Sequence, residues 1–574
     1  MLYDEVKLKM MRELMEIIER NIPGEAYNGR TQKGELGMER YTGKSILEGI
    51  AIGRIYWYRK QQYQVVRTEV SDKEAEKRRF ADAVETAKEQ LAALYEETLT
   101  SVGEDHAMIF DIHKMMLEDD DYLDAVDEVL EEGLNAEYAV KIAQNQFAEM
   151  FASMDDEYMK ARAADIKDIS QRVIRILAGV PEDGILADEP VIVVADDLTP
   201  SETVKMDKNK ILAFVTVRGS SNSHTAILAR SMNLPALVNT GMEAGEELNG
   251  KIGVVDGFRG EFLVEPEQEL LDEMIRRKNQ WAADLEALEQ LKGKDNVTSD
   301  GRRIDIFANI GKVEDTDGAL AADAGGIGLF RSEFLYLGRE NFPTEEEQFL
   351  SYKAVLEKMG DKKVIIRTLD IGADKKVDYF ALEEEENPAL GYRAIRICLD
   401  RPEIFITQLR ALFRASAYGR EAVMFPMVVS VAEVRRIKEI VNQVKEDLVA
   451  QGHPMKDVEL GIMIETPAAA LISDELAREV DFFSIGTNDL TQYTLAVDRQ
   501  NQKLEGICDT HHPAILKLIE LTVKNAHKEG IWAGICGELA ADTELTETFL
   551  AMGVDELSVS ASSVLKVRKA VRDL

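Results

Sequence analysis

Short apolar runs separated by helical segments dominate the second half of the chain. Each run has the length of a buried strand and is followed by a segment with helical periodicity. Eight β/α units in about 275 residues is the size of a TIM barrel, whereas a doubly wound open sheet, the alternative, would need fewer strands. The runs are Ile304–Asn309, Gly326–Phe330, Lys363–Leu369, Ala422–Val428, Leu460–Ile464, Phe482–Ile485, Trp532–Ile535 and Glu556–Val559.

The pattern in the first half changes several times. Residues 46–59 carry short apolar runs with glycines, as in a small β-element. From about residue 71 to residue 179, charged and apolar positions alternate at helical spacing, and strand patterns return at Val191–Ala195 and Ile211–Val217. A helical block is therefore predicted inside a small α/β domain. Residues 265–293 predict a long polar helix that connects this half to the barrel.

The first residues form a separate piece. Residues 2–20 have the pattern of a charged amphipathic helix, and a polar stretch follows as far as Met38. This segment is predicted to be an N-terminal extension of the rest of the chain. Met38 is a plausible alternative start.

Composition narrows the classes of partner. The 574 residues carry a net charge of −37, which argues against a nucleic-acid or anionic-membrane partner. The three cysteines have neither metal-site nor disulfide spacing. No apolar stretch is long enough for a membrane span, and the N-terminus lacks the apolar core of a signal peptide. We expect a cytoplasmic protein with no membrane insertion.

One histidine stands at a predicted anion site. In Gly219–Arg230, an apolar strand is followed by a Gly/Ser turn, His224 and good helix formers. The free N–H groups and the dipole of a helix N-terminus attract anions, so a histidine there could carry a phosphoryl group. The other interpretation, that His224 merely packs, stays open on the local sequence.

Polar residues recur where the predicted barrel strands end. Catalytic residues of TIM barrels come from these positions. Any one of these residues alone is more simply structural, but the whole set on one barrel face indicates a shared site. They are Arg331, Arg367, Asp370, Lys375, Glu465, Asn488, Asp489, Asp498, Arg499, Cys536 and Glu538.

The residue types indicate what such a site binds. Arginines offer a fork geometry for phosphate or carboxylate oxygens, and the candidates are Arg331, Arg367, Arg393 and Arg499. Two carboxylates, Glu465 and Asp489, suit Mg²⁺ bound together with a substrate phosphate. The predicted substrate is a small phosphorylated carboxylate. Cys536 is either a proton-transfer residue or a buried core cysteine. No phosphate-binding loop of the ATP-binding type is present.

Several of these segments resemble a known family. Over about residues 40–574 the chain is similar to enzyme I of the phosphoenolpyruvate-dependent sugar phosphotransferase system. The run Gly486–Arg499 is the most specific segment. The others are Leu198–Thr203, Ser223–Arg230, Arg331–Leu335, Arg367–Gly372, Gly391–Ala394, Ile464–Ala469 and Cys536–Ala540.

The resemblance implies a multidomain α/β fold: a swivelling phosphohistidine domain with an inserted helical subdomain, a linker helix and a C-terminal (β/α)8 barrel. It implies that phosphoenolpyruvate is the substrate, that the small carrier protein HPr docks on the helical subdomain, and that the barrel forms a homodimer. The implied division is an N-terminal extension 1–40, a phosphohistidine domain 41–71 and 181–264, an HPr-binding subdomain 72–180, a linker 265–297 and a barrel 298–574.

The resemblance also implies roles for single residues. His224 would be phosphorylated, with Thr203 hydrogen-bonded to its imidazole, and Cys536 would protonate the enolate to pyruvate. Glu465 and Asp489 would hold Mg²⁺. Phosphoenolpyruvate would be bound by Arg331, Arg367, Arg393, Asn488, Asp489 and Arg499.

One departure and two alternatives accompany the resemblance. Ser221 stands where the family often has an arginine, which predicts altered stabilisation of the phosphohistidine rather than loss of function. A pyruvate phosphate dikinase or phosphoenolpyruvate synthase would need a large ATP-binding domain before His224, and the segment there is too short and too helical. A regulatory relative without turnover is disfavoured by the intact set of barrel residues. The type of HPr, sugar or nitrogen-regulatory, stays open, although the lack of a preceding sensory domain favours the sugar type.

Overall fold

The computed structural model describes residues 38–574 apart from short internal stretches. The chain divides into two compact units, Met1–Ala283 and Asp284–Leu574. The helix predicted over residues 2–20 lies outside the described residues. The internal stretches are 59–62, 102–103, 155–156, 181–188, 200–201, 203–205, 207, 221–222, 244, 373–374, 376, 500, 502–503 and 505–506.

An eight-stranded mixed sheet forms the centre of the first unit. Its strand order is β1-β8-β7-β3-β4-β5-β6-β2, with β3, β4, β5 and β6 parallel to one another. Every residue of β4 is buried, as the continuous apolar run Val191–Ala195 predicts. The strands are β1 Glu39–Thr42, β2 Lys44–Leu47, β3 Ile50–Tyr58, β4 Val191–Ala195, β5 Ile211–Thr216, β6 Ala236–Val238, β7 Ile252–Asp256 and β8 Glu261–Val264.

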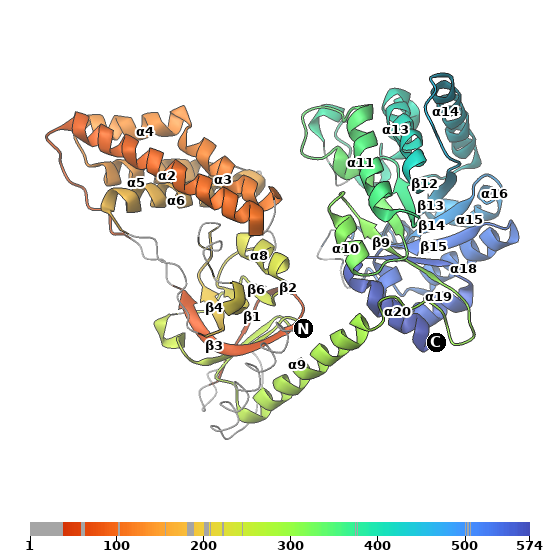
Figure 1. Cartoon of the computed structure of the whole chain (residues 1–574), viewed down its shortest axis with the longest axis horizontal. Coiled ribbons are helices and arrows are strands. Elements are labelled where there is room, and N and C mark those ends of the chain that lie inside the picture. Colours follow the sequence, from red (N-terminus) through yellow and green to blue (C-terminus); the bar gives the residue numbers. More distant parts are fainter. Residues whose placement is uncertain are drawn as a thin grey trace. The chain divides into compact units, whose positions relative to one another are not determined.

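Five helices lie between β3 and β4 in the chain and pack together as a bundle (Figure 1). In α4, Asp119 caps the N-terminus by accepting from the Tyr122 N–H, and Tyr122, Val126 and Leu130 are buried at i, i+4 spacing. The predicted helical block is therefore observed. The helices are α2 Lys73–Ser101, α3 Glu104–Leu117, α4 Asp120–Glu131, α5 Ala136–Ala152 and α6 Glu157–Ala178.

Two further helices lie in the described residues of this half of the chain. Helix α8, His224–Met232, follows β5, and helix α9, Gln268–Glu289, follows β8. In α9 only Leu271 and Met274 are buried, which agrees with the polar helix predicted from the sequence.

The second unit is a closed barrel of eight parallel strands (Figure 1). The predicted TIM barrel is confirmed, and each of the eight predicted runs overlaps one of its strands. Closure excludes the open-sheet alternative. The strands are β9 Asp305–Ile310, β10 Ile327–Arg331, β11 Lys363–Arg367, β12 Arg420–Phe425, β13 Glu459–Ile464, β14 Phe482–Gly486, β15 Trp532–Cys536 and β16 Glu556–Val559.

Helices surround the barrel strands. The outward-facing strand residues and the helices share one large apolar core. None of the helices in the described part of the chain is long and apolar enough to span a membrane. The barrel helices are α10 Asp315–Ala321, α11 Glu345–Met359, α12 Ile395–Asp400, α13 Pro402–Ala415, α14 Val431–Ala450, α15 Pro467–Leu471, α16 Ser473–Leu476, α17 Thr487–Leu495, α18 Pro513–Lys528, α19 Thr546–Met552 and α20 Val564–Asp573.

The barrel interior is filled by side chains rather than open. Because side chains alternate across a strand, every second residue points inward. Leu329, Met424, Met463 and Phe482 belong to one buried interior cluster. A substrate is therefore excluded from the barrel axis and can be bound only at an end of the barrel.

Candidate active site

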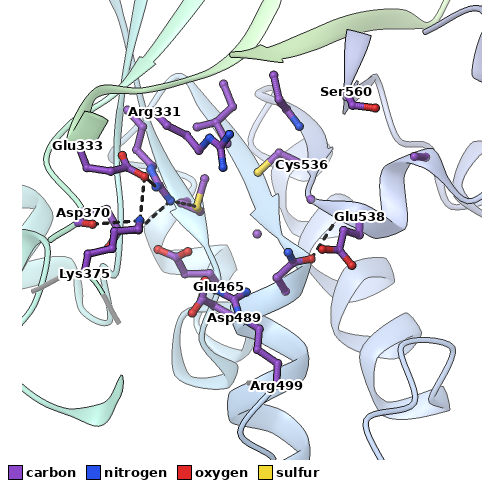
Figure 2. Close-up of a pocket in the computed structure, with 18 of the residues that line it drawn as sticks. Arg331, Glu333, Asp370, Lys375, Glu465, Asp489, Arg499, Cys536, Glu538 and Ser560 are labelled. Carbon is purple, nitrogen blue, oxygen red and sulfur yellow. Dashed lines mark hydrogen bonds and ion pairs between the residues drawn. The ribbon is translucent and has the colours of Figure 1, made fainter. Parts of the chain in front are cut away.

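A cavity of about 670 Å³ lies at the carboxyl ends of the barrel strands (Figure 2). Arg331, Arg367 and Cys536 are each the last residue of a strand, and Glu465 directly follows β13. The cavity is thus built from the positions where a TIM barrel places its chemistry. It is lined by Asn309, Leu329, Arg331, Glu333, Arg367, Asp370, Lys375, Arg393, Met463, Glu465, Gly486, Asn488, Asp489, Arg499, Cys536, Gly537, Glu538, Ala541, Ser560 and Ser563.

Arg367 is one of the buried cations that line the cavity. Its guanidinium lies 2.7 Å from Glu333 and 2.9 Å from Asp370, and Lys375 lies 2.8 Å from the same Glu333 oxygen. Burial raises the pKa of Asp370, but Arg367, Arg393 and Lys375 outweigh burial and hold that pKa well below its usual range. Asp370 is therefore ionised, and its ion pairs fix the direction of the cationic groups.

A second buried arginine comes from the long segment after β11. Arg393 stands just before α12, and its guanidinium lies 2.8 Å from Asp370 and 3.3 Å from Asp489. It also donates to the Tyr493 hydroxyl at 3.1 Å. Asp370 is thus shared by Arg367 and Arg393, which keeps the two guanidinium groups together in the cavity.

Two arginines are exposed at the cavity. Arg331 stacks over the Phe334 ring, with 5.0 Å between the guanidinium carbon and the ring centre. Arg499 lies 3.7 Å from Asp489. With Arg367, Arg393 and Lys375, they bring five cationic side chains to one cavity of a chain whose net charge is −37. This concentration of positive charge favours an anionic ligand.

Glu465 has one oxygen free for a ligand. Its Oε1 accepts from the Met427 N–H at 2.6 Å, whereas the buried Oε2 has no hydrogen-bond partner. Burial raises the pKa of Glu465, Asp489 and Asp370 raise it further, and Arg367 and Arg393 only partly offset this. A cation bound between Glu465 and Asp489 would lower the pKa of Glu465 again and keep its carboxyl group ionised. This pair of oxygen donors therefore fits a hard divalent ion.

Cys536 faces the cavity and is 2% exposed. Burial raises the pKa of its thiol to about 12, against a weaker opposing effect of the Ser484 hydroxyl. The thiol is therefore protonated at neutral pH. It can act as an acid toward a bound ligand but is a poor nucleophile.

The histidine predicted at a helix N-terminus is in that place. Helix α8 begins at His224, directly after the N-cap Ser223, whose hydroxyl accepts from the Ala226 N–H at 3.4 Å. Strand β5 and the turn at Gly219, with φ of 108°, precede it as predicted. The other N–H groups of the first turn face the end of the helix, where an anion is favoured. Thr203 and Ser221 lie outside the described residues.

The structure brings the predicted barrel residues together. Of the eleven strand-end residues predicted to share a site, ten line this cavity, and so does Arg393; Asp498 does not line it. The sequence reasoning gave no role to Glu333, although it holds both Arg367 and Lys375. Its position could have indicated a site residue, because Glu333 lies two residues after the end of β10. Asn309, near the end of β9, was also missed.

Three family profiles match most of the chain. They are described as "PEP-utilising enzyme, N-terminal" at residues 42–162, "PEP-utilising enzyme, mobile domain" at 187–260 and "PEP-utilising enzyme, PEP-binding domain" at 285–574. The last profile covers the whole barrel with its cationic cavity. Fold and site together define a phosphoenolpyruvate-utilising enzyme.

Curated relatives narrow this class. The phosphoenolpyruvate-protein phosphotransferase of Bacillus subtilis (strain 168) is 44% identical over 94% of this chain and 95% of its own length. The proteins of that name from Bacillus sp. (strain S) and Listeria monocytogenes are 45% and 44% identical, over 93% of this chain and 93% and 94% of theirs. The chain belongs to the phosphoenolpyruvate-protein phosphotransferase family. It is a transferase enzyme that carries out phosphoenolpyruvate-dependent phosphotransfer.

Proposed function

We propose that this enzyme transfers the phosphoryl group of phosphoenolpyruvate to His224 and then to a histidine of the carrier HPr, releasing pyruvate. This transfer would be the first step of sugar uptake. The observation that carries the proposal is the cationic cavity beside a buried, protonated thiol. The cavity suits an anion with a phosphate and a carboxylate, and the thiol suits an enolate that must be protonated.

The cationic side chains would position the substrate and neutralise its charge. Phosphoryl transfer depends on positioning and on electrostatic stabilisation more than on covalent work by the protein. Arg367 and Arg393 are held by carboxylates before any ligand arrives, so their donors need little reorganisation. Arg331, Asn488 and Arg499 would complete the contacts with phosphoenolpyruvate, with Asp489 orienting Arg499 and Arg393.

Glu465 and Asp489 would hold Mg²⁺. The unpartnered Oε2 of Glu465 and the nearby Asp489 are hard oxygen donors, and phosphate and water oxygens would complete the ion's coordination. The described residues contain no cluster of three or more His, Cys, Asp or Glu side chains arranged to hold a metal, which agrees with a site completed by the substrate. When bound, the ion would neutralise charge on the transferring group.

Glu465→Gln should weaken Mg²⁺ binding in the presence of phosphoenolpyruvate by at least about tenfold, because a neutral amide replaces one of two anionic ligands. Paramagnetic Mn²⁺, followed by electron paramagnetic resonance, gives a readout that does not depend on turnover. Glu439→Gln, on the exposed face of α14, is the matched control. Unchanged ion affinity in the Glu465 variant would contradict the assignment.

His224 would be the phosphoryl acceptor. The nucleophile must be a neutral imidazole, because its ring nitrogen attacks with a free electron pair. The N–H groups at the start of α8 would stabilise the phosphoryl oxygens. Thr203 would hydrogen-bond the imidazole. A hinge-type movement would bring His224 to the barrel site and then to HPr.

Cys536 would donate a proton to the enolate. Its burial keeps the thiol protonated and close to the bound ligand. A proton placed on the carbon of the enolate gives pyruvate, which draws the transfer forward. The alternative interpretation from the sequence, a core cysteine, explains the burial but not the contact with the cavity.

Cys536→Ala should lower steady-state pyruvate formation by about 10²- to 10⁴-fold, the range that a positioned acid contributes. Exchange of the phosphoryl group between phosphoenolpyruvate and the protein should continue, because that step does not use the thiol. Rapid-quench measurement of both rates separates the two steps. Cys398→Ala, a buried cysteine in α12, controls for loss of a core thiol. Pyruvate release at the rate of the parent enzyme would remove the acid role.

The helical block of residues 72–180 would dock HPr. Met108 and Met115 of α3 are 53% and 68% exposed, and exposed methionines suit a protein-binding surface. His113, on the same helix, is fully buried with its Nε2 3.2 Å from Asp165, so it belongs to the core of the bundle. The barrel would form the homodimer.

Mixing the purified chain with phosphoenolpyruvate, Mg²⁺ and HPr, with and without ATP, tests the proposed function. Labelled HPr should form equally in both mixtures, and a strict requirement for ATP would overturn the proposal.

A further inference from the structure

A second buried acid lies inside the barrel. Glu556 of β16 is 2% exposed, and neither of its carboxyl oxygens makes a hydrogen bond of good geometry, although the Ser558 hydroxyl interacts with the group. Leu557 and Val559 pack outward in the core between strands and helices, so the alternate residues Glu556 and Ser558 face the barrel interior. A buried polar group without partners costs free energy, which a purely structural role does not explain.

Two glycines make room for this carboxyl group. A β carbon placed on Gly534 would lie 2.1 Å from Glu556 Oε2, and one placed on Gly328 would lie 2.5 Å from Oε1. Gly534 precedes Cys536 by two residues on the same face of β15, a rise of about 7 Å. The Glu556 carboxyl therefore occupies the interior position next below the Cys536 thiol.

Ser484 is a buried hydroxyl residue that neighbours both the acid and the thiol in the register of the barrel. Ser484 of β14 is aligned with Gly534, over which the carboxyl of Glu556 lies. Ser484 is buried and affects the pKa of the Cys536 thiol, and its hydroxyl has no hydrogen-bond partner within the described structure. It is placed to accept a proton from one side and donate one to the other.

The opposite side of Glu556 leads to the amino-terminal end of the barrel. Asp305 of β9 is aligned with Glu556, and both Asp305 and Lys363 interact electrostatically with its carboxyl group. Lys363 Nζ lies 2.7 Å from Glu459, whose side chain is 36% exposed. Charged and solvent-contacting groups thus approach Glu556 from the end of the barrel opposite to the substrate cavity.

We propose that Glu556 and Ser484 form a proton relay that returns a proton to the Cys536 thiolate after each turnover. The proposal rests on the acid role of Cys536 proposed above. The thiol S–H bond breaks as the enolate carbon gains its C–H bond, leaving a thiolate. The Ser484 hydroxyl then gives its proton to the sulfur while the Glu556 carboxyl group gives a proton to the Ser484 oxygen. The Glu556 carboxylate regains a proton from water at the Asp305 and Lys363 end.

The protonation state of Glu556 suits a donor. Burial raises its pKa well above the ordinary value, and Asp305 adds to this, while Lys363 and Ser558 oppose it only in part. The carboxyl group is therefore neutral before turnover. A neutral buried acid keeps its proton available for the thiolate while bound pyruvate shields the sulfur from solvent.

A matched control stands on the opposite side of the barrel wall. Glu421 of β12 is also buried, and both of its oxygens lack hydrogen-bond partners. Its neighbours Ala422 and Met424 face the interior, so Glu421 points outward, away from Cys536. Glu421→Gln removes an equivalent buried acid without touching the relay.

The experiment compares Glu556→Gln, Ser484→Ala and Glu421→Gln in the full-length enzyme with Mg²⁺, HPr and labelled phosphoenolpyruvate. Rapid quench measures the first turnover and the steady state separately. The first pyruvate should form at the parent rate in every variant, because Cys536 begins protonated. Later turnovers should slow about tenfold in the Glu556 and Ser484 variants. This is less than the 10²- to 10⁴-fold effect of a direct acid, because solvent reaches the thiol once pyruvate has left. Glu421→Gln should show no such slowing.

Steady-state rates at the parent level in Glu556→Gln would overturn the relay. So would an equal fall of the first and later turnovers, because that pattern reports a structural lesion. These outcomes differ from failure of the proposed function itself, in which the parent enzyme would not form acid-labile phosphohistidine at all.

Discussion

His224→Ala should abolish transfer of the phosphoryl group from phosphoenolpyruvate to HPr, with no acid-labile label remaining on the chain. The reason is chemical: no other group at the start of α8 can replace an imidazole as a carrier, because a serine or threonine phosphoester would be acid-stable. The measurement is labelling with radioactive phosphoenolpyruvate, followed by acid treatment and gel separation. Phosphoenolpyruvate should still bind to the barrel, because the substrate site lies in the other unit.

His527→Ala is the control for this experiment. His527 is 41% exposed at the end of α18, where it pairs with Asp555, and it does not line the cavity. This variant should label as the parent does. Persistent acid-labile label on the His224 variant would show that another histidine carries the phosphoryl group.

Arg367→Met should weaken phosphoenolpyruvate binding by at least about thirtyfold. Loss of one partner in a buried charged contact costs about 2–5 kcal/mol, and each ~1.4 kcal/mol is tenfold in affinity. The same substitution leaves Glu333 and Asp370 short of a cation, so the free energy of unfolding should also fall by about 3–5 kcal/mol. Calorimetric titration and urea unfolding measure the two effects independently.

Arg367→Lys tests the positive charge of Arg367 separately from the planar geometry of its guanidinium group. Lysine keeps the positive charge beside Glu333 and Asp370 but loses the planar fork, so stability should largely return while affinity does not. Arg435→Met, at a side chain 68% exposed on α14, should change neither quantity. Full affinity in Arg367→Met would remove Arg367 from the substrate site.

The barrel could be predicted because its strands are encoded locally. Runs such as Phe482–Ile485 are mainly apolar, end at glycine or a polar residue and alternate with helices, so their number and order follow from the sequence. Placement of site residues at strand ends then follows from the barrel alone. This reasoning reached Arg331, Arg367 and Cys536 without knowledge of any contact.

Other parts of the site depend on long-range contacts that spacing does not encode. Arg393 enters the cavity from a loop 26 residues after the end of β11, and only the family resemblance gave it a specific contact. Glu333 was missed because its partners Arg367 and Lys375 lie 34 and 42 residues away. Glu556 lies in a strand that was predicted correctly, but its burial against Gly534 depends on the register of the closed barrel.

The most direct measurement of the central claim places the phosphoryl group on the parent chain. The purified enzyme is incubated with Mg²⁺ and labelled phosphoenolpyruvate, without nucleotide and without HPr, and the label is located by mass spectrometry under conditions that preserve phosphohistidine. The account predicts one phosphoryl group per chain, on His224, with an equal amount of pyruvate released. Label on another residue, or no label until a nucleotide is added, would contradict it.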